Sequence, residues 1–159
     1  LNDILELAQA PKGSMYHHFP GGKEQIGVCV IDDLTAGLIA LFTQSRARSA
    51  QAMLRQSGEQ LVSVAEKTNF EICALYSSFV AERKSSPLLG EAVAAGYGRM
   101  LDTLQQRMVD DGIAPRAAKE KAELAVALLE GGSLLAQARQ DAGLLRVAVK
   151  QAALLCRAE

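Results

Sequence analysis

A run of residues from Ala10 to Lys23, APKGSMYHHFPGGK, combines side chains whose types and order suit the binding of nucleic acid. Lys12 and Gly13 stand at the predicted start of a short helix, where unpaired backbone N–H groups and the helix dipole favour a phosphate. Gly13 also lets a backbone approach closely. The polar residues that follow are long enough to reach phosphates or base edges in a major groove. They are Ser14, Tyr16, His17 and His18.

The same run gives weaker signals for metal binding and for catalysis. His17 and His18 are adjacent, so their side chains diverge by roughly 100° on a helix and do not form the i, i+4 pair that chelates a metal. Ser14 with His17 resembles a nucleophile and its base, but no acidic residue follows to orient the histidine. We therefore predict no metal, no cofactor and no enzymatic activity. A packing role for Tyr16, and surface roles without specific contact for His17 and His18, stay open.

Two short helices must position these residues. The pattern predicts one helix over 2–8 and a second over 12–18, separated by Gln9-Ala10-Pro11 and ended by Pro20-Gly21-Gly22. Met15 and Phe19 are four residues apart and should face the interior. This is the outline of a helix-turn-helix.

The rest of the chain is predicted to be helical, which makes the fold class all-α. Apolar residues recur at three- and four-residue steps, Trp is absent, and aromatic residues make up only 4%. Ser86 is a predicted N-cap, Pro87 and Pro115 open helices, and Gly112 suits a left-handed C-terminal position. The expected helices are 23–46, 50–67, 72–84, 86–112, 115–140 and 143–157. The first of these would extend roughly 35 Å, long enough to couple two parts of the molecule.

Composition limits the setting. The net charge of −1 argues neither for nor against a nucleic-acid partner. Cys29, Cys73 and Cys156 form no C-x-x-C, so we predict buried free thiols in a reducing cytoplasm. The most apolar stretch, 124–138, is interrupted by Glu130 and too short for a bilayer, so no membrane-spanning segment or membrane partner is expected.

The run PKGSMYHHFPGGKE resembles the recognition-helix signature of the TetR/AcrR family of transcriptional regulators, in the form found in the LmrA/YxaF-like branch. NFEICALYSSFVAE and LAVALLEGGSLLAQARQD resemble two later helices of that branch, so the resemblance covers most of the chain. It implies that Lys23 contacts DNA backbone phosphates. The family's DNA-binding unit has three helices, and this chain is expected to lack the first. We divide it into a partial DNA-binding domain, 1–22, and a helical ligand-binding and dimerisation domain, 23–159.

The resemblance also implies a ligand cavity among the middle helices. Tyr76, Tyr97 and Met100 are the predicted lining residues, although each is equally typical of a helical core. The last two helices are expected to pair with those of a second copy around a twofold axis. The predicted interface residues are Leu128, Gly132, Leu135, Ala136, Leu144, Ala148, Gln151 and Leu155. A monomer that buries these stripes internally is the alternative.

We therefore expect a cytoplasmic, homodimeric repressor that binds a double-stranded DNA operator and is released from it by a small-molecule effector. The alternative is a helical small-molecule binding protein that does not regulate DNA.

Overall fold

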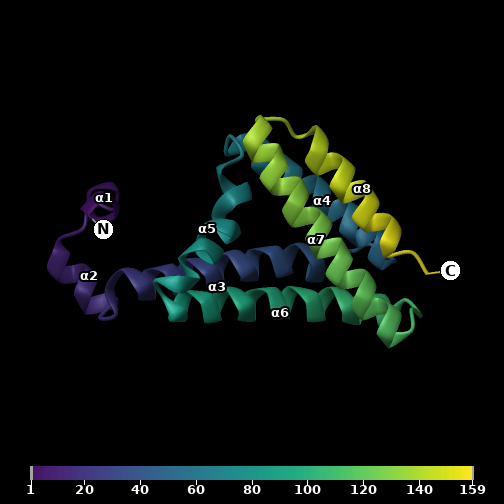
Figure 1. Ribbon diagram of the computed structural model, residues 1–159, viewed down its shortest axis with the longest axis horizontal. Coiled ribbons are helices and arrows are strands. Elements are labelled where there is room, and N and C mark those ends of the chain that lie inside the picture. The colour runs from purple at the N-terminus through teal and green to yellow at the C-terminus, as the bar shows by residue number, and fades with distance from the viewer. Residues whose placement is uncertain (1, 159) are drawn as a thin grey trace.

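The computed structural model describes residues 2–158, apart from the side chain of Ala74, and shows an all-helical protein (Figure 1). No strand occurs within this range, which confirms the expected fold class. In chain order the elements are α1 Asn2–Leu7, α2 Lys12–His18, α3 Gly22–Thr43, α4 Ala50–Lys67, the 3₁₀ helix η1 Glu71–Ala74, α5 Leu75–Ala81, the 3₁₀ helix η2 Glu82–Lys84, α6 Pro87–Asp110, α7 Pro115–Arg139 and α8 Gly143–Leu155.

The helices form two groups, one made of α3 and α6 and the other of α4, α7 and α8. Helices α3 and α6 lie side by side, whereas α4, α7 and α8 pack together across one end of that pair (Figure 1). Helix α5 descends between the groups. Helices α1 and α2 project from the beginning of α3, away from the rest of the chain (Figure 1). Helix α3 therefore connects α2 with the packed helices of the rest of the chain.

Capping residues set several helix ends as expected. The Ser86 hydroxyl accepts a hydrogen bond from the Leu89 N–H at 3.3 Å, and Pro87 occupies the first turn of α6. Gly112 follows α6 with a φ of 92°, the left-handed conformation that favours glycine. The predicted helix over 12–18 is also confirmed.

Two predicted helices differ from the structure. Helix α3 ends at Thr43 rather than at residue 46. The helix expected over 72–84 is divided into η1, α5 and η2. The chain enters this stretch through Asn69 and Phe70, which have φ values of 49° and 62°, so it begins in a tight turn. The break between the expected helices 50–67 and 72–84 is thus present; asparagine readily adopts a left-handed φ, whereas the φ of Phe70 is set by tertiary packing.

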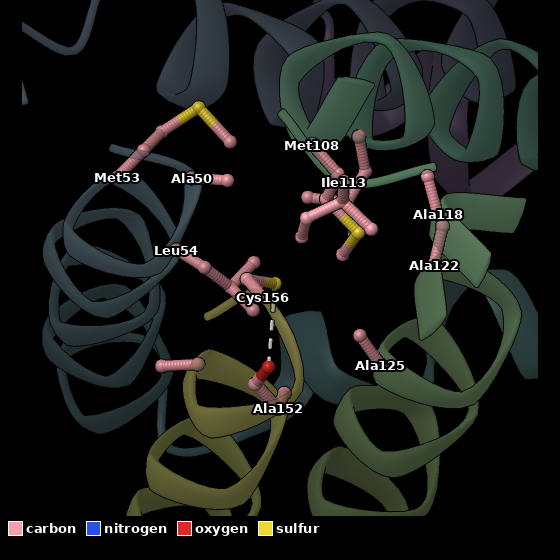
Figure 2. Packing of buried hydrophobic residues seen from close by; sticks show 12 residues of the cluster. Ala50, Met53, Leu54, Met108, Ile113, Ala118, Ala122, Ala125, Ala152 and Cys156 are labelled. Atoms are coloured by element: carbon pink, nitrogen blue, oxygen red, sulfur yellow. Dashed lines mark hydrogen bonds between the residues drawn. The ribbon is translucent and has the colours of Figure 1, made fainter. Parts of the chain in front are cut away.

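The main core joins α4, the end of α6, and helices α7 and α8. Met53, Leu54, Leu104 and Met108 fill it and are at most 2% exposed. Small residues line α7 and α8, which allows these helices to approach closely. Figure 2 shows them facing the larger side chains, with the Cys156 thiol donating a hydrogen bond to the Ala152 carbonyl at 3.3 Å.

Helix α3 is more apolar than the sequence prediction allowed. Among the described helices it is the one long and apolar enough to cross a membrane by length and composition alone, a test that core helices of soluble proteins also pass, so the expectation of no membrane-spanning segment stays a prediction. Its apolar side chains have other contacts. Ile31 is fully buried against α6, while Leu34 and Leu38 also line an internal cavity. A helix that supplies both a core face and a cavity wall needs an unusually broad apolar surface.

All three cysteines are free thiols, but they do not share one environment. Cys73 and Cys156 are buried as expected, and burial raises the pKa of the Cys156 thiol to about 12. Cys29 lies exposed on α3, contrary to the prediction.

Candidate functional site

The polar residues predicted to contact DNA all lie exposed on α2 or at the start of α3. Of the α2 residues, Met15 alone is buried, at 6% exposure, so it fixes which side of this short helix faces inward. Phe19, four residues later, is half-buried. The other six residues of α2 are exposed candidate contact residues, and Lys23 follows, also exposed, in the first turn of α3; the six are Lys12, Gly13, Ser14, Tyr16, His17 and His18. Between Ala10 and Lys23 the sequence has two lysines, two histidines and no acidic residue.

The turn between α2 and α3 fixes the position of α2 relative to the start of α3. Gly22 has a φ of 63°, a conformation that side-chain-bearing residues rarely adopt. The Gly21 N–H donates a hydrogen bond to the Gln25 side-chain oxygen at 2.9 Å, which caps the start of α3. The Tyr16 ring lies beside Gly22 but stays 46% exposed, so its hydroxyl is free to reach a partner.

The histidine rings are closer than their 100° separation suggested. The rings of His17 and His18 are in edge-to-face contact, with centroids 5.2 Å apart. Among residues 2–158, no group of three His, Cys, Asp or Glu side chains is placed to hold a metal ion. The pair therefore forms part of the exposed polar surface.

A cavity of about 520 Å³ lies between α3, α4, α5 and α7. This volume is within the range that holds a drug-sized ligand. Its walls are mostly apolar, and leucines of α3 and α4 contribute to them, among them Leu34, Leu38 and Leu61. Its exposed lining residues, which include Val30, Asp33, Gly37 and Val64, lie on α3 and α4, so the cavity opens between these two helices.

Two of the three predicted lining residues reach this cavity. Tyr76 and Met100 line it, and both are buried. Tyr97 does not, but its ring packs on Tyr76 with centroids 4.9 Å apart. Ligand binding by these residues remains a prediction.

Glu130 forms the polar end of the cavity. It lies on α7, where the Tyr97 hydroxyl from α6 hydrogen-bonds to its carboxyl. Burial raises the pKa of Glu130, and the Tyr97 hydrogen bond offsets only part of this effect. Burial and then the charge of Glu130 raise the pKa of Tyr97 in turn. Ser133 and Cys73 lie on the same side of the cavity.

A buried hydrogen bond ties the cavity wall to α3. The hydroxyls of Thr35 and Tyr76 are bonded to each other, and Thr35 also donates to the Ile31 carbonyl at 2.7 Å. Gly96 of α6 leaves space for this pair, because a Cβ there would lie 2.6 Å from the Tyr76 oxygen and 2.7 Å from the Thr35 oxygen. The pair joins α3, α5 and α6 at one point.

We expect Gly96→Ala to lower the free energy of unfolding by about 1–3 kcal/mol, since the added methyl separates the two hydroxyls or displaces α6. Gly98→Ala is the matched control on the same helix. A Cβ at Gly98 meets nothing within 4 Å, so this variant should gain up to about 1 kcal/mol from helix propensity. Urea denaturation of both variants measures the difference. Equal stabilities would show that Gly96 is not required for close packing.

The predicted interface residues divide into three groups. Gly132, Ala136 and Ala148 are buried in the contact between α7 and α8 of one chain, and a Cβ on Gly132 would lie 2.5 Å from that of Ala148. Within one chain the close approach that Gly132 permits is to α8, and contact of these three residues with a second copy stays a prediction. Leu128, Leu144 and Leu155 are half-buried. Leu135 and Gln151 are exposed.

The outer face of α7 and α8 still carries an apolar stripe. On α7 it contains Leu124, Leu134 and Leu135, which are 41–52% exposed, and on α8 it contains Val147 and Leu154, which are 56% and 48% exposed. Leu124 and Leu135 are 11 residues apart and Val147 and Leu154 are seven apart, which places each pair along one side of its helix, and Leu134 is adjacent to Leu135. We refer to these five residues as the outer stripe.

Comparison with known proteins identifies the family. The C-terminal domain of LmrA/YxaF-like transcriptional regulators matches residues 47–151, which is more than half of the chain. The chain belongs to this TetR-type family. The resemblance inferred from the sequence is thereby confirmed.

Individual relatives agree with this assignment. An HTH-type transcriptional regulator from Mycobacterium tuberculosis is 32% identical over 146 residues, which cover 89% of this chain and 75% of the relative. The HTH-type transcriptional regulator LmrA from Bacillus subtilis is 30% identical over 142 residues, covering 85% and 73%. The crystal structure of a TetR transcriptional regulator from Legionella pneumophila superimposes with a TM-score of 0.81 at 18% identity, covering 95% of this chain and 82% of that one. This last match supports the fold.

Sequence reasoning missed several residues of the LmrA/YxaF-like domain that shape the cavity. Glu130 was interpreted only as an interruption in an apolar run, and Asp33 and Thr35 received no role. A single acidic residue within an apolar helix was the available signal, because such a residue is buried only when a partner or a cavity accommodates it.

Proposed function

We propose that this protein is a homodimeric transcriptional repressor that binds an operator through α2 and is released when a small molecule occupies the cavity. The membership of the LmrA/YxaF-like family supports the regulatory role. One structural observation carries the proposal further. Helix α3 begins beside the exposed face of α2 and supplies a wall of the cavity, so a single continuous helix connects the two sites.

DNA contact is assigned to the exposed residues of α2 and to Lys23. Tyr16, His17 and His18 offer hydrogen-bond groups, and Lys12 and Lys23 offer positive charge within residues 10–23, which include no acidic residue; the exposed Glu24 follows Lys23. Arrangements of this kind position a helix on phosphates and let its side chains contact base edges. Two such helices in a dimer would occupy successive major grooves.

Operator binding by the full-length protein tests this assignment. Fluorescence anisotropy with DNA from upstream of its own gene should show that Tyr16→Ala weakens binding about tenfold, a loss of about 1.4 kcal/mol. Lys23→Ala should reduce the slope of log affinity against log salt concentration by about one unit, because one phosphate contact is lost.

Lys119→Ala is the control for Lys23→Ala. Lys119 is an exposed lysine near the start of α7, and α7 lies far from α2 (Figure 1). Its substitution should leave both affinity and salt slope unchanged. If Lys23→Ala behaves like Lys119→Ala, Lys23 is not a phosphate contact.

Dimerisation is assigned to the outer stripe. Five large apolar side chains at 41–56% exposure on two adjacent helices form a surface that a second copy of the same helices would cover. Gln151 lies exposed on the same helix as Val147 and Leu154 and would add polar contacts. This arrangement keeps the proposed four-helix contact but replaces the buried Gly132, Ala136 and Ala148 with exposed residues.

Effector release requires only that the ligand bind better to one arrangement of the helices than to another. The Thr35–Tyr76 bond joins the cavity wall to α3. A ligand that displaces Tyr76 would therefore also act on the helix that carries α2.

A helical small-molecule binding protein without DNA regulation is the second candidate, and the cavity favours it. The same anisotropy experiment separates the two. Sequence-specific binding that a ligand weakens supports the repressor, whereas ligand binding without any DNA binding supports the alternative.

A further inference from the structure

We propose that the ligand of the cavity is an amphipathic organic cation whose protonated amine pairs with the Glu130 carboxylate. This inference rests on the proposed function, since it specifies the chemistry of the effector. It starts from the charges that surround the cavity.

The described residues that line the cavity include two carboxylic acids and no lysine, arginine or histidine. Asp33 lies exposed on α3, where the cavity opens, and Glu130 lies at the inner end on α7. A ligand therefore passes one acidic group on entry and reaches another inside. An anionic ligand would meet only like charge along this path.

Among residues 2–158, Glu130 has no basic partner in an ion pair. The ion pairs formed by residues 2–158 involve Arg99, Arg107, Arg116 and Arg146, and none of them includes Glu130. The Tyr97 hydroxyl is its neighbour from α6, and the hydroxyl of Ser133 is close on the same helix but interacts with the Cys73 thiol. A carboxylate that is largely removed from water and lacks a counter-ion is unfavourable, so a cation from outside would gain the interaction that the protein does not supply.

The remaining polar groups of the cavity are already bonded. The Ser57 hydroxyl donates to the Leu41 carbonyl at 2.8 Å, and the Tyr76 hydroxyl is bonded to Thr35. Among the described lining residues, Glu130 is thus the carboxyl group at the inner end, and a carboxylate is a stronger acceptor for a cation than the hydroxyls beside it. The leucine-rich walls suit an apolar body attached to the cationic group.

Three probes with the same ten-carbon chain test the proposal: decylamine, 1-decanol and decanoate. They present a cation, a neutral hydroxyl and an anion at pH 7. Isothermal titration calorimetry on the full-length protein should show decylamine binding about tenfold more tightly than decanol, as expected for a charge-assisted hydrogen bond. Decanoate should bind most weakly.

Variants locate the group responsible. Glu130→Gln keeps the size of the side chain and should bring the affinities for decylamine and decanol to within about twofold of each other. Asp33→Asn should keep most of the preference for decylamine, because Asp33 is exposed and screened by solvent. Tyr97→Phe should also keep the preference, because it removes one hydrogen bond to Glu130 but leaves the carboxyl group in place.

The outcomes separate this proposal from the proposed function. Equal affinities for the three probes, tighter binding of decanoate, or an unchanged preference in a folded Glu130→Gln protein would each overturn the cationic ligand and leave the cavity as an effector site. No binding of any probe would overturn both the cationic ligand and effector release. The comparison of probes on the unsubstituted protein does not depend on any variant folding.

Discussion

Gly132→Arg should leave the chain without a cooperative folded state, whether or not the protein dimerises. Gly132 is buried between α7 and α8, and even a methyl group there would overlap the side chain of Ala148. Overpacking a core costs about 1–3 kcal/mol. The buried, unpaired guanidinium adds several kcal/mol more. The total is comparable to the whole stability of a typical domain, about 5–15 kcal/mol.

Circular dichroism and urea denaturation measure this outcome. The variant should show a reduced helical signal and no sharp unfolding transition. A folded, monomeric Gly132→Arg protein would mean that Gly132 contacts a second copy instead of α8, and our account of the α7–α8 packing would be wrong.

Leu135→Arg, the same substitution three residues later, should have the opposite effect: the chain stays folded and the dimer dissociates. Leu135 is 52% exposed within a single chain, so arginine fits without disturbing the core. A twofold dimer carries the new arginine on both subunits. The interface would then bring two like charges against an apolar surface. We expect the dimer dissociation constant to rise by at least about a hundredfold, which corresponds to about 2.7 kcal/mol.

Analytical ultracentrifugation and operator binding measure this second outcome. The monomer should lose most of its operator affinity, because one recognition helix covers only half of a palindromic site. Ala94→Arg, at an exposed position on α6, is the control and should remain dimeric. A fully dimeric Leu135→Arg protein would place the interface away from the outer stripe.

The opposite expectations for Gly132 and Leu135 show what periodicity predicts and what it leaves open. Spacing correctly placed both residues on the same long helix and indicated close packing at the glycine. It could not identify which helix approaches, because an apolar face covered by α8 and one covered by a second copy have the same pattern. Only the packing of α7 on α8 separates the two faces.

Helix boundaries were predictable where a residue has a local mechanism. Ser86 caps α6, Pro87 has a fixed φ, and Gly112 adopts a left-handed φ. Each of these residues lies where the sequence predicted. The break at Phe70 has no such mechanism, since an aromatic residue rarely adopts a φ of 62°. Tertiary packing holds it there, with the ring only 8% exposed.

The recognition surface was predictable for a different reason. The residues from Lys12 to Lys23 form a compact motif whose chemistry is visible in the order of the side chains. The cavity is assembled from residues as distant as Val30 and Ser133, so no local pattern contains it. Tyr76 and Met100 were found because large or adaptable side chains often line cavities. The place of Glu130 in the cavity becomes visible only when the surrounding helices are packed together.

The unbroken length of α3 sets how far a small movement at the cavity is carried. Its 22 residues correspond to a rod of about 33 Å. If the end beside the cavity acts as a pivot, a tilt of roughly 5° moves the far end, next to Lys23, by about 3 Å over that length. A displacement of this size is comparable to the length of a hydrogen bond. Under the proposed function the helix would act as a lever arm, and a ligand that shifts the cavity wall only slightly would move α2 relative to the bases of a bound operator.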